Sequence, residues 1–278
     1  MGISKIILFL AVCVAFWGAL LPQQSFAKAS PFRADQNQPI EIEADHALEW
    51  IREKNIYVVK GNATAKQGGM EIKGDTLTAY YSENPEGGTQ ISKIIAEGQV
   101  EIISALNKAL GDRAVYNLET GKAILTGQYV ELITPTEVIQ AQESLEFFSL
   151  ENKMVARGKV NLQRGKDYLE ADLVKAQFVE DISGALALKR LVAQQNVIIR
   201  TAKEIVYGDY GVYDTQAQKA EVSGKVRIQQ GENWLEGKRA EVDLKTGASQ
   251  LFAGEEQGMP GRVRGVFYPN SQKNPPPK

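Results

Sequence analysis

Cysteine and histidine are nearly absent from this sequence. Its 278 residues include one cysteine, Cys13, and one histidine, His46. Cys13 lies in an N-terminal segment that we expect to be removed, which leaves no thiol for a disulfide, a nucleophile or a thiolate metal site. A catalytic or metal-binding histidine needs partners, and no second histidine or cysteine is available, so we interpret His46 as a surface residue. The sequence therefore predicts neither metal nor other cofactor.

Motifs of the common enzyme classes are also missing. The sequence has no GxSxG nucleophile elbow, no Walker loop and no glycine fingerprint for a dinucleotide. Paired carboxylates for glycoside hydrolysis remain possible by composition, but the acidic residues recur with an internal repeat, as scaffold positions would. The net charge is −2 and both signs are interspersed, whereas a nucleic-acid partner would select a basic patch. We predict a protein that is not an enzyme and does not bind nucleic acid.

The N-terminus has the pattern of a targeting segment. Lys5 precedes the apolar run Ile6–Leu21, and Ser25-Phe26-Ala27 fits the small-x-small cleavage rule. The run of 16 residues is shorter than the roughly 20 that a membrane-spanning helix needs, although an uncleaved anchor remains the alternative. We predict that residues 1–27 are a signal peptide, that residues 28–39 form an extended leader, and that the mature protein is exported.

A short motif recurs along the rest of the chain. Ala96-Glu-Gly-Gln-Val100 is followed by Gly111-Asp112. Similar glycine segments are Val59–Ala63, Ala156–Val160, Ala193–Val197 and Val222–Val226, and similar aspartate pairs are Gly74-Asp75, Ala171-Asp172 and Gly208-Asp209. Residues 42–127 align with residues 139–224 at a constant offset of 97 without a gap. The sequence therefore predicts an internal duplication of a unit that contains three smaller units.

The repeated segments have the pattern of β-strands. Polar and apolar residues alternate in segments such as Glu41–Ala44, Gln99–Ile102 and Lys225–Ile228, as expected for strands with one covered face. Turn residues, including Gln67–Gly69 and Gln230-Gly231, fall between these segments. We predict an all-β fold over residues 40–268, an elongated antiparallel jelly roll or taco of stacked hairpins, and a disordered tail over residues 269–278.

Equivalent apolar positions in the repeat are candidates for a lipid-binding groove. They follow the recurring glycines or aspartates, so we expect them to stand on facing sides of the stack. They are Leu77, Val100, Ile102, Val115, Val160, Leu162, Leu173, Val197, Ile199, Val226 and Ile228. Simple core packing is the alternative. If the two faces leave a groove, burial of an acyl chain there would contribute about 0.8 kcal/mol per CH₂ group.

The two ends of the stack are candidates for assembly. A terminal strand has unpaired N–H and C=O groups, and such an edge pairs with another chain unless it is guarded. Ile40 and Ile42 alternate with glutamates in the first strand, and Val263, Val266 and Phe267 lie in a last segment that carries arginines. The opposite charges predict head-to-tail β-augmentation. The alternative is that the C-terminal tail folds back over the last edge.

The motifs together resemble the OstA-like (LptA) family of lipopolysaccharide-export proteins. The resemblance rests on Ile42–Asp45, Val59–Asn62, Ile72–Asp75, Ala96–Val100 and Gly111–Tyr116, and it extends to Gly261–Phe267. The duplication makes this chain longer than a usual member.

The resemblance implies a periplasmic jelly-roll protein whose apolar interior carries the lipid A acyl chains of lipopolysaccharide between the inner and outer membranes. It also implies LptC-like and LptD-like jelly-roll partners. Two alternatives stay open: a purely structural β-repeat scaffold with a closed core, and an LptC-like component that keeps its N-terminal membrane anchor.

Overall fold

The protein is almost entirely β-structure in a computed structural model. The structure describes residues 38–83, 88–104, 106–182, 186–256 and 259–269, so the predicted signal peptide, nearly all of the leader and nearly all of the tail lie outside it. The chain divides into two units. The N-terminal unit comprises the described parts of residues 26–158 and 177–187, and the C-terminal unit comprises those of residues 159–176 and 188–278.

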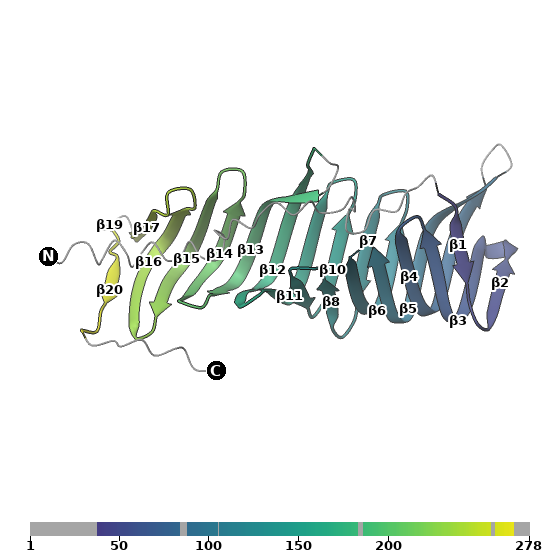
Figure 1. The fold of residues 1–278 in the computed structure, drawn as a ribbon, viewed down its shortest axis with the longest axis horizontal. Coiled ribbons are helices and arrows are strands. Elements are labelled where there is room, and N and C mark those ends of the chain that lie inside the picture. The colour runs from purple at the N-terminus through teal and green to yellow at the C-terminus, as the bar shows by residue number, and fades with distance from the viewer. Residues whose placement is uncertain (1–37, 84–87, 105, 183–185, 257–258, 270–278) are drawn as a thin grey trace. The chain divides into compact units, whose positions relative to one another are not determined.

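The N-terminal unit consists of short and long strands with one single-turn 3₁₀ helix, η2 (Arg52–Lys54). Its strands are β1 (Ile40–Glu43), β2 (Ala47–Ile51), β3 (Ile56–Gln67), β4 (Met70–Glu83), β5 (Thr89–Ser104), β6 (Asn107–Asn117), β7 (Lys122–Thr126), β8 (Val130–Ile133), β9 (Val138–Ala141), β10 (Ser144–Phe148) and the first half of β11 (Lys153–Arg164). The long strands β3 to β6 are antiparallel and follow one another as hairpins (Figure 1), whereas β1 pairs with β3, β10 with β7 and β8 with β6.

The C-terminal unit repeats this design. It contains most of β12 (Asp167–Glu180) and β13 (Leu186–Arg200), followed by β14 (Ile205–Asp214), β15 (Lys219–Gln230), β16 (Asn233–Asp243), β17 (Ser249–Phe252) and β20 (Arg264–Val266), with a small separate ladder between β18 (Glu255–Glu256) and β19 (Met259–Pro260). Turns fall where the sequence predicts them, at Gly68-Gly69 and Gly231 for example. The all-β antiparallel prediction is confirmed.

The ladders between the long strands are interrupted by β-bulges that coincide with the repeated motif. The register of β4 with β5 shifts between Lys73 and Thr76, and that of β5 with β6 shifts between Glu97 and Val100. Gly98 has a φ of +78°, and a Cβ on it would lie 2.1 Å from Oδ2 of Asp75. Glycine is needed there because it alone adopts this φ readily and leaves room for the facing carboxylate. The bulges divide each sheet into two halves along a crease.

At the terminal strands, two short strands share one long neighbour. β2 pairs with Ile56–Lys60 of β3 and β1 with its other half, Thr64–Gln67. In the C-terminal unit, β20 pairs with Trp234–Glu236 of β16 and β17 with Arg239–Val242. The crease therefore interrupts the terminal strands instead of bending them. Among the described residues, no helix has the length and hydrophobicity required to cross a membrane.

Candidate functional site

The inward face of the N-terminal unit is apolar in both halves of its sheet. Residues that face one another across neighbouring strands form a continuous row in each half. The row in one half is Val59, Leu77, Ala96, Ala114, Leu125 and Leu145, and the row in the other half is Ala65, Ile72, Ile102, Ala109, Leu132 and Ile139. All twelve side chains are buried.

The two rows face each other across narrow cavities. One cavity of about 20 Å³ is bordered by Ile72 and Ile102 from one half and by Ile94, Ala96 and Ala114 from the other, among others. A second cavity of about 30 Å³ lies between Leu132 and Leu145, with Phe147 and Met154 in its wall. Each has room for about one or two water molecules. The interior is thus apolar and, in this state, almost closed.

The predicted groove residues of this unit lie at or beside these cavities. Leu77, Val100 and Ile102 are buried, and Ile102 borders both cavities. Val115 is only half-buried, although it borders the first cavity. Contact of these residues with lipid stays a prediction.

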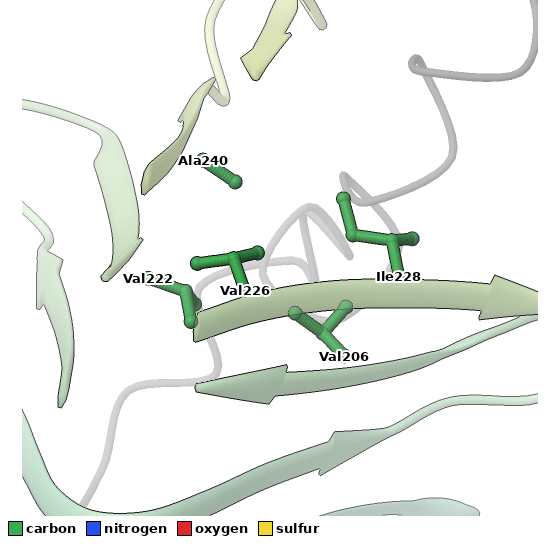
Figure 2. Packing of buried hydrophobic residues seen from close by; sticks show 5 residues of the cluster. All are labelled: Val206, Val222, Val226, Ile228 and Ala240. Atoms are coloured by element: carbon green, nitrogen blue, oxygen red, sulfur yellow. The ribbon is translucent and has the colours of Figure 1, made fainter. Parts of the chain in front are cut away.

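The C-terminal unit buries its predicted residues less evenly. Val160, Val197, Val226 and Ile228 are buried, whereas Leu162, Leu173 and Ile199 are half-buried. Figure 2 shows the core of this unit, in which Val226 and Ile228 project from β15 toward Ala240, with Val222 and Val206 beside them. Ile199, Leu235 and Leu251 pack against this cluster. The apolar interior around β15 is therefore occupied by the unit's own side chains.

A change of alternation at the crease explains the half-buried positions. In β6 the residues Asp112 and Arg113 are both exposed, so burial passes from odd-numbered to even-numbered positions and Ala114, not Val115, faces inward. The same change in β12 buries Val174 and leaves Leu173 half-buried. In the ladder of β5 with β6 the extra residue lies in β5, which spans Glu97–Val100 opposite Gly111–Arg113 and keeps its own alternation, so β6 changes faces opposite its neighbour's bulge. In β4, by contrast, Leu77 lies two residues after the repeated aspartate Asp75, on the inward side of the change, and is buried.

Two of the repeated aspartates bind a neighbouring segment at the crease: Asp112 binds the connection between β7 and β8, and Asp172 binds the bulge of β13. Asp112 accepts a hydrogen bond from the backbone N–H of Gln128 at 2.7 Å, and Asp172 accepts one from the side-chain amide of Asn196 at 2.7 Å. His46 occupies the corresponding place beside Gly61. Within the described ranges, no group of three or more His, Cys, Asp or Glu side chains is placed to hold a metal ion.

One ion-pair network crosses three strands of the N-terminal unit. Glu146 of β10 lies 2.7 Å from Nε of Arg157 on β11 and 3.4 Å from Nζ of Lys122 on β7. Burial raises the pKa of this carboxyl, but the hydrogen bond and charge of Arg157 and the charge of Lys122 outweigh that effect and hold the pKa below its ordinary value of 4.5. Glu146 is therefore ionised and ties β7 and β11 to β10.

The predicted assembly residues lie on terminal strands. Ile40 and Ile42 are half-buried in β1. Val266 is half-buried in β20, while Val263 and Phe267, which flank that strand, are 46% and 52% exposed. A backbone hydrogen bond from Tyr268 to Oδ1 of Asn233 adds to the three residue pairs that hold β20 on β16. Self-association through these strands stays a prediction.

Sequence reasoning missed an aromatic cluster at the edge of the N-terminal unit. Trp50, Tyr57 and Tyr81 are in contact, with ring centroids 5.7 Å apart for Trp50 and Tyr57 and 5.0 Å apart for Tyr57 and Tyr81. Leu48 and Trp50 alternate in β2 as inward positions do. The repeat contained the signal, because Leu48 and Trp50 align with Leu145 and Phe147 at the offset of 97.

Comparisons with known proteins agree with this architecture. A family model described as "LptA/(LptD N-terminal domain) LPS transport protein" matches twice, over residues 41–145 and over residues 139–248. No curated protein matches. Among solved structures, LptH, titled the LptA homologous periplasmic component of the conserved lipopolysaccharide transport device from Pseudomonas aeruginosa, shares 12% identity over 85% of this chain and 100% of its own, with a TM-score of 0.21. That score is too low to carry an argument. The two family matches span most of the chain, which therefore belongs to the LptA/LptD N-terminal domain family of lipopolysaccharide transport proteins.

Proposed function

We propose that this protein is a periplasmic bridge component that binds lipopolysaccharide by its acyl chains and passes it toward the outer membrane. The observation that carries the proposal is the pair of facing apolar rows in the N-terminal unit, which enclose two cavities. Of the residues that the structure describes, no charged residue borders the first cavity, and Glu146 is the one charged residue that borders the second. An acyl chain has no polar group to satisfy, so a continuous apolar wall suits it, and each buried CH₂ group contributes about 0.8 kcal/mol.

The present cavities are smaller than an acyl chain. Their volumes of about 20 and 30 Å³ mean that a chain enters only if the two halves of the sheet separate around the crease. The halves are linked through the bulges at the crease, whereas the two facing rows meet only through side chains. Lipid contacts would then replace the apolar contacts that close the empty interior.

A second candidate function is supported by the same volumes. A closed apolar core with room for one or two waters is also what a purely structural β-scaffold would have. In that case the protein would link other components of the transport system without binding lipid itself. The LptC-like alternative depends on residues 1–27, which lie outside the described residues.

The terminal strands support assembly with similar folds. Glu41 and Glu43 alternate with isoleucines in β1. Arg264 begins β20, and Arg262 lies two residues before it. We infer that these edges join head to tail, with a second copy or with LptC-like and LptD-like jelly rolls. A head-to-tail contact that does not close produces an open row of subunits, as a bridge needs.

Photo-crosslinking in cells tests lipid binding. A photoreactive amino acid at Ile102, Leu162 or Ile199 would report on the inward face, and one at Glu101 would report on the opposite face of the same strand. Lipopolysaccharide captured from at least one inward site but not from Glu101 is the expected result. Capture from neither face, or equal capture from both, would leave only the structural scaffold.

A further inference from the structure

The inward face of the N-terminal unit is open at β2. Leu48 and Trp50 are 56% and 49% exposed, whereas Val59, which faces Leu48 across the ladder with β3, is 0% exposed. Figure 1 shows β2 beside β3 at the margin of this unit. Exposure rises over a single strand because no described residue covers the far side of β2. The apolar row thus ends in a rim.

The second copy of the repeat shows how the residues that correspond to Leu48 and Trp50 lie when neighbouring strands cover them. Leu48 and Trp50 align with Leu145 and Phe147, which are 7% and 5% exposed and border the second cavity. The same repeat position therefore lines the interior in one copy and forms the open rim in the other. A ligand that enters the interior from this side meets Leu48 and Trp50 first.

The turn that follows the rim departs from the repeat in its charge. Residues 52–54 are Arg, Glu and Lys, where the second copy has Ser149, Leu150 and Glu151. The first turn thus carries two cations and one carboxylate, and the second carries one carboxylate. All three residues of the first turn are exposed. Within these three turn residues, cations are present only in the open copy, whereas beside the covered copy Lys122 and Lys153 lie over the ring of Phe148.

Arg52 is held beside the rim by aromatic contacts. Its guanidinium carbon lies 4.0 Å from the centroid of the Trp50 ring. The indole Nε1–H donates a hydrogen bond to Oη of Tyr81 at 2.8 Å, and Tyr57 stacks on the ring. Stacking orients a guanidinium and leaves its N–H groups available at the ring's edge. A fixed indole beside an oriented cation suits a ligand that is apolar at one end and anionic at the other.

We propose that Arg52 and Trp50 form a headgroup site at this rim, where the guanidinium binds a phosphate of an incoming phosphorylated glycolipid while its acyl chains pass Leu48. This proposal rests on the proposed function. Arginine is suited to the role because its planar fork donates two parallel hydrogen bonds to a phosphate. Lys54, also exposed on the turn, adds a second cation, and an uncharged lipid would gain nothing from either.

Two lipids that differ only in phosphate test the proposal. Hexa-acylated lipid A with two phosphates and the same lipid without phosphate are titrated into the purified protein and into R52Q. We expect R52Q to bind the phosphorylated lipid about tenfold more weakly, the effect of losing a charge-assisted hydrogen bond, and the dephosphorylated lipid within twofold of the parent protein. Far-ultraviolet circular dichroism confirms that the variant is folded.

R227Q is the matched control, because Arg227 also lies over a tryptophan, 5.4 Å from the centroid of Trp234 in the C-terminal unit. It should bind both lipids as the parent protein does. Equal affinities of R52Q and the parent for phosphorylated lipid A would overturn the proposal, and so would an equal loss for both lipids or for R227Q. If R52Q changed only the self-association of the protein and not its lipid binding, the rim would bind a second copy of the chain, and the proposal would be wrong. If the parent protein bound neither lipid, the proposed function itself would fail.

Discussion

At the scale of single residues, the crease depends on glycines that tolerate both positive φ and a close neighbour. We expect Gly98→Ala to lower the free energy of unfolding by about 2–4 kcal/mol, because it combines strain at φ +78° with a Cβ 2.1 Å from Oδ2 of Asp75. Gly165 has a φ of +60° but open space around it, and Gly69 has open space without a positive φ. Urea denaturation should therefore rank the three alanine variants, with Gly98→Ala the least stable. We expect Gly165→Ala to unfold with a free energy about 1 kcal/mol lower than that of the parent protein, and Gly69→Ala with a free energy close to that of the parent. Equal stability of Gly98→Ala and Gly165→Ala would show that the close approach of the Asp75 carboxylate does not contribute to the loss of stability.

Gln195 provides the converse test at the same repeat position. It aligns with Gly98 at the offset of 97, yet it is glutamine with a φ of +65°. We expect Gln195→Gly to raise the free energy of unfolding by about 0.5–1 kcal/mol. Glycine relieves the left-handed strain, but the greater conformational entropy of glycine in the unfolded chain offsets part of this stabilisation. Thermal and urea unfolding measure the difference. A variant less stable than the parent would mean that the glutamine side chain itself stabilises the bulge.

At the scale of elements, we expect the ionisation of Glu146 to influence how β7, β10 and β11 respond to acid. Its pKa in the folded protein is lower than 4.5 although burial opposes this, because Arg157 and Lys122 favour the carboxylate. A carboxyl with a lowered pKa stabilises the fold above its unfolded pKa and loses that contribution as the pH falls through its folded pKa. We expect Glu146→Gln to cost about 1–2 kcal/mol at pH 7 and progressively less as the pH falls below 4.5.

The control is Glu241→Gln. Glu241 pairs with Arg239 at 2.6 Å, but both side chains are more than two-fifths exposed, so its removal should cost less than about 1 kcal/mol. Urea denaturation of both variants across pH 3 to 7 gives the comparison. A loss for Glu146→Gln that does not change with pH would show that packing, and not charge, holds the three strands.

At the scale of the whole molecule, assembly depends on which segment covers β16. If β20 presents the C-terminal edge, deletion of residues 261–278 should abolish concentration-dependent self-association and leave the β-sheet circular dichroism signal unchanged. Deletion of residues 271–278 alone keeps β20 and should leave assembly intact. Sedimentation velocity over a concentration series distinguishes the two. Unchanged oligomers after the longer deletion would exclude β20 as the edge, and stronger association would mean that β20 guards β16 instead of presenting it.

The sequence alone determined the class and organisation of the fold. Alternation with a period of two, turn glycines and the repeat at an offset of 97 are local properties, and they predict antiparallel hairpins because backbone geometry restricts which residues suit strands and bulges. The recurring glycine segments lie at the bulges because a positive φ favours glycine, but the bulges themselves were not predicted from the sequence. The family resemblance also rested on these motifs.

Only the tertiary structure decided which apolar residues face inward and which are exposed. Val115 and Leu173 lie in alternating segments, but their strands change faces at the crease. In β6 this change lies opposite a bulge of the neighbouring strand β5, so the segment itself does not show it. Leu48 and Leu145 occupy the same repeat position, yet one is 56% exposed and the other 7%, because burial depends on whether another strand lies alongside. Glu146, Lys122 and Arg157 meet only through the pairing of β10 with β7 and β11. Strand pairing is a property of the assembled sheet, and no single segment of sequence contains it.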